Sequence, residues 1–134
     1  MANIKTALVA RAGAHSGLTA LIGPRFYAYN RVPQEIATPY VTFQKTSSRR
    51  NHTMGGDTGL VSAMYRIEAW DATQDGAEAV AGQLKACFNR FHGTSDTIAM
   101  DTILDDERDA TSLEQTFARL FRVRCDFKVF YREP

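Results

Sequence analysis

Apolar and polar residues alternate along the stretch 121–132, near the end of the chain. A period of two is typical of a β-strand that buries one face and leaves the other in water. The sequence therefore predicts a long strand here with a single apolar face. The apolar positions are Phe121, Val123, Cys125, Phe127, Val129 and Tyr131, and the polar positions include Arg122, Arg124, Asp126, Lys128 and Arg132.

Three further stretches have the composition of strands. Residues 40–44 are rich in β-branched and aromatic side chains, and residues 61–70 alternate with their apolar side chains at odd positions. Residues 97–104 also read as a strand. We expect all of these strands to belong to one sheet.

Helical spacing is clearest over residues 77–91, where apolar side chains recur at intervals of three and four. Asp75 is positioned to cap the start of this helix, and His92-Gly93 marks its end. An earlier helix is expected over residues 4–12. A second short one follows, with Ser16 as its N-cap and Gly23-Pro24 as its stop.

The remaining segments have no periodicity. Residues 25–38 read as an extended connection, residues 46–59 as a polar loop containing glycine, and residues 105–109 as a solvated loop after the third strand. The order is then helix, strand, strand, helix, strand, strand. It predicts an α+β fold of two layers, with a mostly antiparallel four-stranded sheet and helices packed on one face, as a single domain over residues 1–134.

Composition narrows the classes of function. The chain has 134 residues, about one domain's worth, and a net charge of +1, which argues against binding nucleic acid or membranes through bulk charge. The apolar run 7–10 is too short for a signal peptide, and no stretch is long enough to span a membrane. We expect a cytoplasmic protein with two buried free thiols, Cys87 and Cys125.

Residues 105–109 are the densest charge cluster and the first candidate for a metal or catalytic site. A calcium loop starting at Asp105 would need glycine and glutamate where Ala110 and Thr116 stand, which excludes it. The histidines (His15, His52 and His92) have no ligand spacing. We expect no metal and no cofactor. A small metal-dependent hydrolase stays open as an alternative, using Asp105, Asp106, Glu107 and Asp109.

Catalytic motifs are missing from the sequence. No G-x-S-x-G elbow occurs, and residues 55–59 lack the lysine and following helix of a phosphate-binding loop. We expect no catalytic residues.

The clustered acidic side chains call for a positively charged partner, either in the same chain or across an interface. Adjacent exposed charges repel by about 1 kcal/mol at 4 Å in water, and Arg108 is the one local cation among Asp105, Asp106, Glu107 and Asp109. In a ring of subunits the acidic loop of one copy can meet the basic loop of the next. This hypothesis assigns the assembly interface to Lys45, Arg49, Arg50 and His52 on one side and to Asp105, Asp106, Glu107, Arg108 and Asp109 on the other.

Several stretches, in order and at similar spacing, resemble the tail-completion family of long-tailed phages, which also occurs in prophages and gene transfer agents. The stretches are "VPQEIATPYVTFQ", "TGL", "EAWDAT", "FNRFHGT", "LDDERD" and "FRVRCDFKVFYRE". The matching residues are Pro33, Gln34, Pro39, Gly59, Leu60, Trp70, Gly93 and the run 106–109. Between Asp109 and Phe121 the chain departs from the family, since "ATSLEQTFARL" replaces an expected turn with proline and glycine.

The resemblance implies a structural tail terminator and no enzyme. Such a protein forms a homo-hexameric ring on the tail tube protein, ends tail polymerisation and joins the tail to the head connector protein. It would lie at the head-proximal end of the virion tail after assembly in the host bacterial cytoplasm, and DNA would only pass through its lumen as cargo. The resemblance implies no membrane partner.

Two other readings remain open. One is a head-completion or connector protein of the same virion. The other is a nucleic-acid binder that uses Arg49, Arg50 and the face bearing Arg122, Arg124 and Lys128. Because ordering a loop costs about 1–2 kcal/mol per residue, we also expect residues 46–59 to be mobile in the isolated chain and ordered in a ring.

Overall fold

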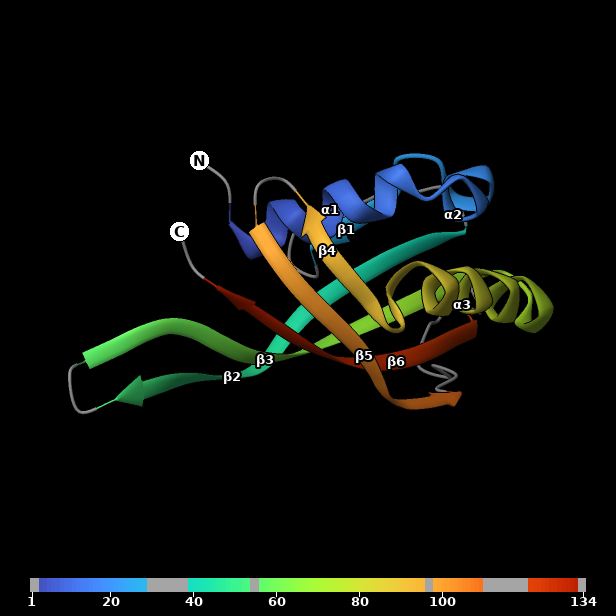
Figure 1. The fold of residues 1–134 in the computed structure, drawn as a ribbon. Coiled ribbons are helices and arrows are strands. Elements are labelled where there is room, and N and C mark those ends of the chain that lie inside the picture. Colours follow the sequence, from blue (N-terminus) through green and yellow to red (C-terminus); the bar gives the residue numbers. More distant parts are fainter. Residues whose placement is uncertain (1–2, 29–38, 54–55, 96–97, 110–120, 133–134) are drawn as a thin grey trace.

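A computed structural model describes residues 3–28, 39–53, 56–95, 98–109 and 121–132, with the side chains of 51–53, 56–59 and 109 left aside. In this part of the chain three helices cover one face of a six-stranded, twisted sheet (Figure 1). The elements are α1 (Ile4–Ala14), α2 (Ser16–Ile22), β1 (Phe26–Ala28), β2 (Tyr40–Thr53), β3 (Gly56–Asp71), α3 (Gln74–Phe88), β4 (Phe91–Ser95), β5 (Ile98–Asp109) and β6 (Phe121–Arg132).

The strands follow the order β1-β2-β3-β6-β5-β4 across the sheet. Neighbouring strands are antiparallel except β1 and β2, which are parallel. The central pair, β3 and β6, is in register from Leu60 opposite Arg132 to Asp71 opposite Phe121. The predicted α+β class is therefore confirmed, with helices on one face.

The core lies between the helices and the apolar face of the sheet. Phe127 on β6 is fully buried and contacts Phe88 of α3, with ring centroids 5.8 Å apart. Phe26 of β1 stacks on Phe43 of β2 at 5.1 Å. The alternation in β6 and the helical spacing in α3 thus meet at one interface. The buried residues of α3 are Ala77, Val80, Ala81, Leu84, Cys87 and Phe88.

The prediction of four strands is wrong, because β1 and β4 were not expected. The helix was expected to run to residue 91 and to stop at His92-Gly93, but α3 ends at Phe88 and β4 begins at Phe91. Arg90 adopts a φ of 60°, a left-handed conformation that turns the chain from α3 into β4. β1 has three residues, too few to give a periodic signal, and residues 29–38 of the expected connection lie outside the described residues.

Two predicted loops are strands instead. Residues 46–53 and 56–59 extend β2 and β3 into a long hairpin, and residues 105–109 continue β5. The polar composition of these segments gave no sign of a strand. Backbone hydrogen bonds to a neighbouring strand hold these polar residues in an extended conformation that the local sequence alone does not favour. The expected mobility of residues 46–59 in the isolated chain stays a prediction.

The predicted helix caps also need correction. Thr73, and not Asp75, caps α3 by accepting a hydrogen bond from the backbone N–H of Gly76 at 3.1 Å. Ser16 is the first residue of α2 and His15 occupies the cap position. Gly23 ends α2 with a φ of 57°, as expected for the residue after a helix. None of the described helices is long and apolar enough to cross a membrane.

We expect replacement of Leu84 by alanine to lower the free energy of unfolding by about 2–5 kcal/mol, because this fully buried side chain joins α3 to the sheet. Chemical denaturation measures the change. Val9 on α1, 42% exposed, provides the control, since Val9→Ala removes little buried surface. Equal losses for the two variants would contradict the described core.

We expect both native thiols to resist alkylation at pH 8 until the chain unfolds. The prediction of two buried free cysteines is confirmed, and burial raises the pKa of Cys87 to about 11 and that of Cys125 to about 12. Both groups are therefore protonated thiols at pH 8, and the thiolate is the reactive form. A thiol-reactive chromophore should report two equivalents after denaturation and close to none before it, whereas rapid labelling of the folded chain would contradict this.

Candidate assembly surfaces

Two strand segments have no neighbouring strand on one side among the described residues. β1 pairs with β2 only at residues 41–43, so residues 44–53 form one edge of the sheet. β4 pairs with β5 only as far as Thr102, so residues 103–109 form another. All nine residues of the expected interface lie on these two segments, which we call the basic edge (44–53) and the acidic edge (103–109).

The basic edge presents its cations to both faces of the sheet. Arg50 stands opposite the buried Val61, on the side that carries the helices, whereas Arg49 stands opposite Ser62 on the helix-free side. Lys45 lies on the helix side, with its ammonium 5.9 Å from the ring centroid of Tyr65. All three cations are exposed, and the side chain of His52 lies outside the described residues.

Each described carboxylate of the acidic edge has a cation nearby in the same chain. Glu107 contacts Lys85 of α3 at 3.0 Å, and Asp106 contacts Arg108 at 2.7 Å. Asp105 lies 3.7 Å from Lys128 of β6. Arg108 is the one cation within the run itself, and the expected further cations come from the same chain, since Lys85 and Lys128 reach the cluster from elements distant in sequence.

These ion pairs leave the acidic edge available for other contacts. Each involves partly exposed side chains, and exposed pairs typically contribute about 0–1 kcal/mol. The hydrogen bond from Arg108 lowers the pKa of Asp106 below its ordinary value, so Asp106 stays ionised at neutral pH. A cation on another molecule can thus compete for these carboxylates at small cost.

The carboxylates of the acidic edge do not converge on one point. A register shift at Asp105 separates Leu104 from Asp106. Beyond it, Asp106 stands opposite Asp126 on the helix-free side, and Glu107 stands opposite the buried Cys125 on the helix side. Within the described ranges no group of three or more His, Cys, Asp or Glu side chains is arranged to hold a metal ion.

Side chains already occupy two backbone N–H groups of the acidic edge. The N–H of Leu104 donates to the side-chain oxygen of Asn89 at 3.0 Å. The N–H of Glu107 donates to the carboxylate of Asp106, also at 3.0 Å. These two backbone N–H groups are therefore not available to another strand. The charges and the bulge of the acidic edge also hinder uncontrolled pairing with another strand.

The two edges lie too far apart to meet within one chain. On β5, Met100 and Asp106 are six residues apart, a separation of roughly 20 Å along the strand. Two strands lie between β2 and β5, which adds about 14 Å across the sheet. Across the sheet, Arg50 lies in line with Val61, Tyr131 and Met100. Asp106 lies in line with Asp126, Arg66 and Gln44.

Two cations on the helix-free face of β6, Arg122 and Lys128, lie beside acids, and the acid Asp126 of β6 lies beside a cation of β3. Arg122 pairs at 2.9 Å with Glu68, which is only 3% exposed, and its guanidinium also lies 5.0 Å from the ring centroid of Trp70. Asp126 lies 3.6 Å from Arg66. This face is therefore a network of mixed charge, in contrast to the continuous basic strip that the nucleic-acid reading requires.

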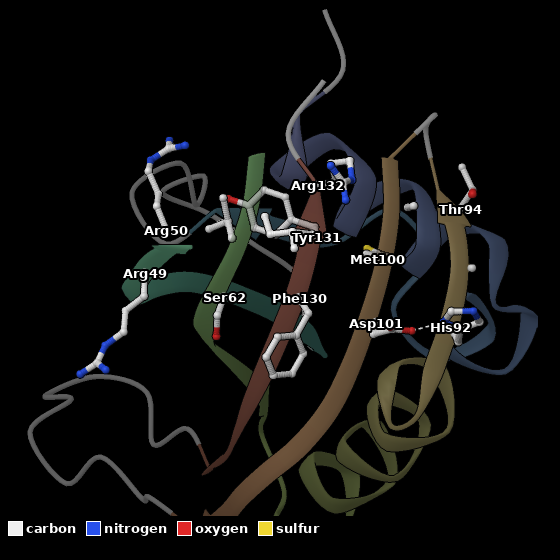
Figure 2. A pocket seen from close by; sticks show the side chains of 14 residues that line it. Arg49, Arg50, Ser62, His92, Thr94, Met100, Asp101, Phe130, Tyr131 and Arg132 are labelled. Carbon is white, nitrogen blue, oxygen red and sulfur yellow. Dashed lines mark hydrogen bonds and ion pairs between the residues drawn. The ribbon is translucent and has the colours of Figure 1, made fainter. Parts of the chain in front are cut away.

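A groove of about 660 Å³ opens on the same face of the sheet (Figure 2). Phe130, 40% exposed, lies at its centre, with Ser62 on one side and the hydrogen-bonded pair Asp101 and His92 on the other. Sequence reasoning missed this groove. The available signal was Phe130 itself, an apolar residue at a position where the alternation of β6 calls for a polar one.

Comparison with known proteins places residues 6–132 in one family. The family model described as "Tail completion protein gp17" matches residues 6–132. None of the curated proteins matches the sequence.

Solved structures share the fold over nearly the full length. A chain in the structure titled "Virion of native gene transfer agent (GTA) particle" superposes with a TM-score of 0.77 at 16% identity, covering 97% of this chain and 95% of that one. A second structure, whose title names no function, gives a TM-score of 0.62 at 16% identity, covering 98% and 94%. The chain belongs to the tail completion protein gp17 family, and it is a structural component of a virion tail.

Proposed function

We propose that this protein is a tail terminator: a homo-hexameric ring that caps the tail tube, ends its polymerisation and joins the tail to the head connector. The family match over residues 6–132 supports this proposal, as does the fold shared with a chain of a gene transfer agent virion. The ring lies at the head-proximal end of the tail after assembly in the bacterial cytoplasm, and DNA passes through its lumen as cargo.

The observation that carries the ring is the position of the two charged edges. They lie on opposite sides of one sheet and bear opposite charge. When the basic edge of one copy contacts the acidic edge of the next, the first copy still exposes its acidic edge and the second still exposes its basic edge. A heterologous contact of this kind repeats from copy to copy and closes into a ring when the rotation permits. The interface then contains Lys45, Arg49, Arg50 and His52 from one copy, and Asp105, Asp106, Glu107, Arg108 and Asp109 from the next.

We expect a species of six times the 14.9 kDa of one chain in light scattering behind size exclusion at low salt, and ring-shaped particles in negative stain. High salt should reduce this species, because screening weakens contacts between exposed charges. If the chain is monomeric at every salt, purified tail tubes must recruit it to one end. Recruitment by portal assemblies and not by tubes would instead identify a head-completion protein, and failure with both would overturn the terminator assignment.

We expect charge reversal at either edge to weaken assembly and the combined reversal to restore it. Arg49→Glu places an acid against the acidic edge, and Asp106→Lys places a cation against the basic edge. Arg49 and Asp106 both lie on the helix-free side of the sheet, so the two reversed charges can face each other in the double variant. Each single change should raise the protein concentration needed for ring formation by about tenfold or more, the equivalent of about 1.4 kcal/mol.

The control for this pair is Lys5→Glu, an equal change of charge at an exposed position of α1 outside both edges. It should leave assembly unchanged, and denaturation should show all four variants folded. A double variant that assembles no better than the singles would remove the two edges from the interface without removing the ring itself.

A further inference from the structure

Strand alternation restricts how a partner can reach the charges of one edge. On the basic edge, Arg49 and Arg50 point to opposite faces of β2. On the acidic edge, Asp106 and Glu107 point to opposite faces of β5. A partner lying flat on either face reaches only half of each set, whereas a strand placed beside the edge, in the plane of the sheet, reaches both halves.

The signs of the edges select one pairing among the three that are possible. Two basic edges repel each other, and so do two acidic edges, because like charges placed opposite each other on adjacent strands are destabilising. A basic edge beside an acidic edge places opposite charges across the new strand pair. The contact selected in this way is head-to-tail and excludes the two symmetric dimers.

The strand directions allow this pairing in the antiparallel form. β2 is antiparallel to β3, β3 to β6, and β6 to β5, so β2 and β5 run in opposite directions in one chain. When the next copy continues the same sheet, its β5 lies antiparallel to β2. Antiparallel strands pair through hydrogen bonds perpendicular to the strands and need no crossover connection.

We propose that the basic edge of one copy pairs directly with the acidic edge of the next, so that the sheet continues from subunit to subunit around the ring. This inference rests on the proposed ring and names its contact. The register that matches charge and face places Arg49 opposite Asp106, Ser48 opposite Glu107 and Ser47 opposite Arg108. In each of these pairs both residues lie on the same face of the sheet.

The acidic edge of the separate chain is closed until the neighbour arrives. The carboxylate of Asp106 holds the N–H of Glu107 and also binds Arg108. In the proposed pair Arg49 gives Asp106 a new cationic partner, which releases the N–H of Glu107 to donate to a backbone carbonyl of β2. Asp106 thereby keeps the edge from pairing with strands that bring no cation.

The test is disulfide trapping with Ser47→Cys and Arg108→Cys in one chain. Both positions are exposed on the helix-free face, and Cys87 and Cys125 are buried. Mild oxidation at low salt should produce a ladder of covalent oligomers on a non-reducing gel, because paired residues of adjacent strands come within disulfide distance. Trapping also collects short-lived contacts, so it does not require a stable ring.

The matched control combines Ser48→Cys with Arg108→Cys. Ser48 stands opposite Ala63 and faces the helix side, so its thiol cannot reach the helix-free face of a continuing sheet. This control and both single variants should stay monomeric on the gel. Equal ladders in test and control, dimers from a single variant, or the absence of a ladder would each overturn the strand pairing. Rings seen by light scattering without a ladder would overturn the pairing alone and leave the terminator function standing.

Discussion

The antiparallel pairing of β3 with β6 determines which way every other side chain of the sheet points. Its register runs unbroken from Leu60 and Arg132 to Asp71 and Phe121, and α3 packs over its apolar side. A slip of one residue would move Phe127 and Cys125 into water and bring Lys128 and Asp126 under the helix. Burial therefore fixes the register, and the register places the charges of the outer strands on defined faces.

The length of the strands explains why both charged segments are edges. β2 and β3 continue beyond the helices as a hairpin, and β5 continues beyond its short partner β4 (Figure 1). An edge with vacant backbone groups is prone to non-selective pairing, which charges and bulges restrain. Register shifts occur on β2 near Lys45 and Arg50 and on β5 at Asp105, so charge and bulges coincide on both edges. In the proposed ring, the same charges that hinder pairing with unsuitable strands distinguish the correct partner.

The sequence was informative wherever a local period reflects burial. The alternation of residues 121–132 predicted β6, and the spacing of Val80, Leu84 and Phe88 predicted α3, because both patterns repeat over several turns or pleats. β1 and β4 are too short to repeat, and the polar ends of β2 and β5 have no buried face to produce an apolar period. Those ends are strands because of hydrogen bonds to β3 and β6, which are non-local.

Non-local contacts also limited what the sequence could reveal about the candidate site. Its nine residues were proposed mainly from their charge, and the structure places them on two edges of the sheet. Lys85 and Lys128 as partners of the acidic residues were not recognisable, since contacts between α3, β5 and β6 depend on the fold. Phe130 was visible as an exception to the alternation, but the groove around it is lined by residues from five strands and could not be read from the local sequence.

The weakness of the individual charge pairs is what suits such edges to assembly on a template. An exposed pair contributes about 0–1 kcal/mol, whereas association costs an estimated 4–15 kcal/mol in lost freedom of motion. One edge contact is therefore too weak to hold two copies together for long. In a closed ring every copy makes two such contacts, and binding to a tube end adds a third and brings the copies close together. In the proposed ring, edges closed by their own side chains keep separate copies apart, and the closed geometry makes the same contacts sufficient.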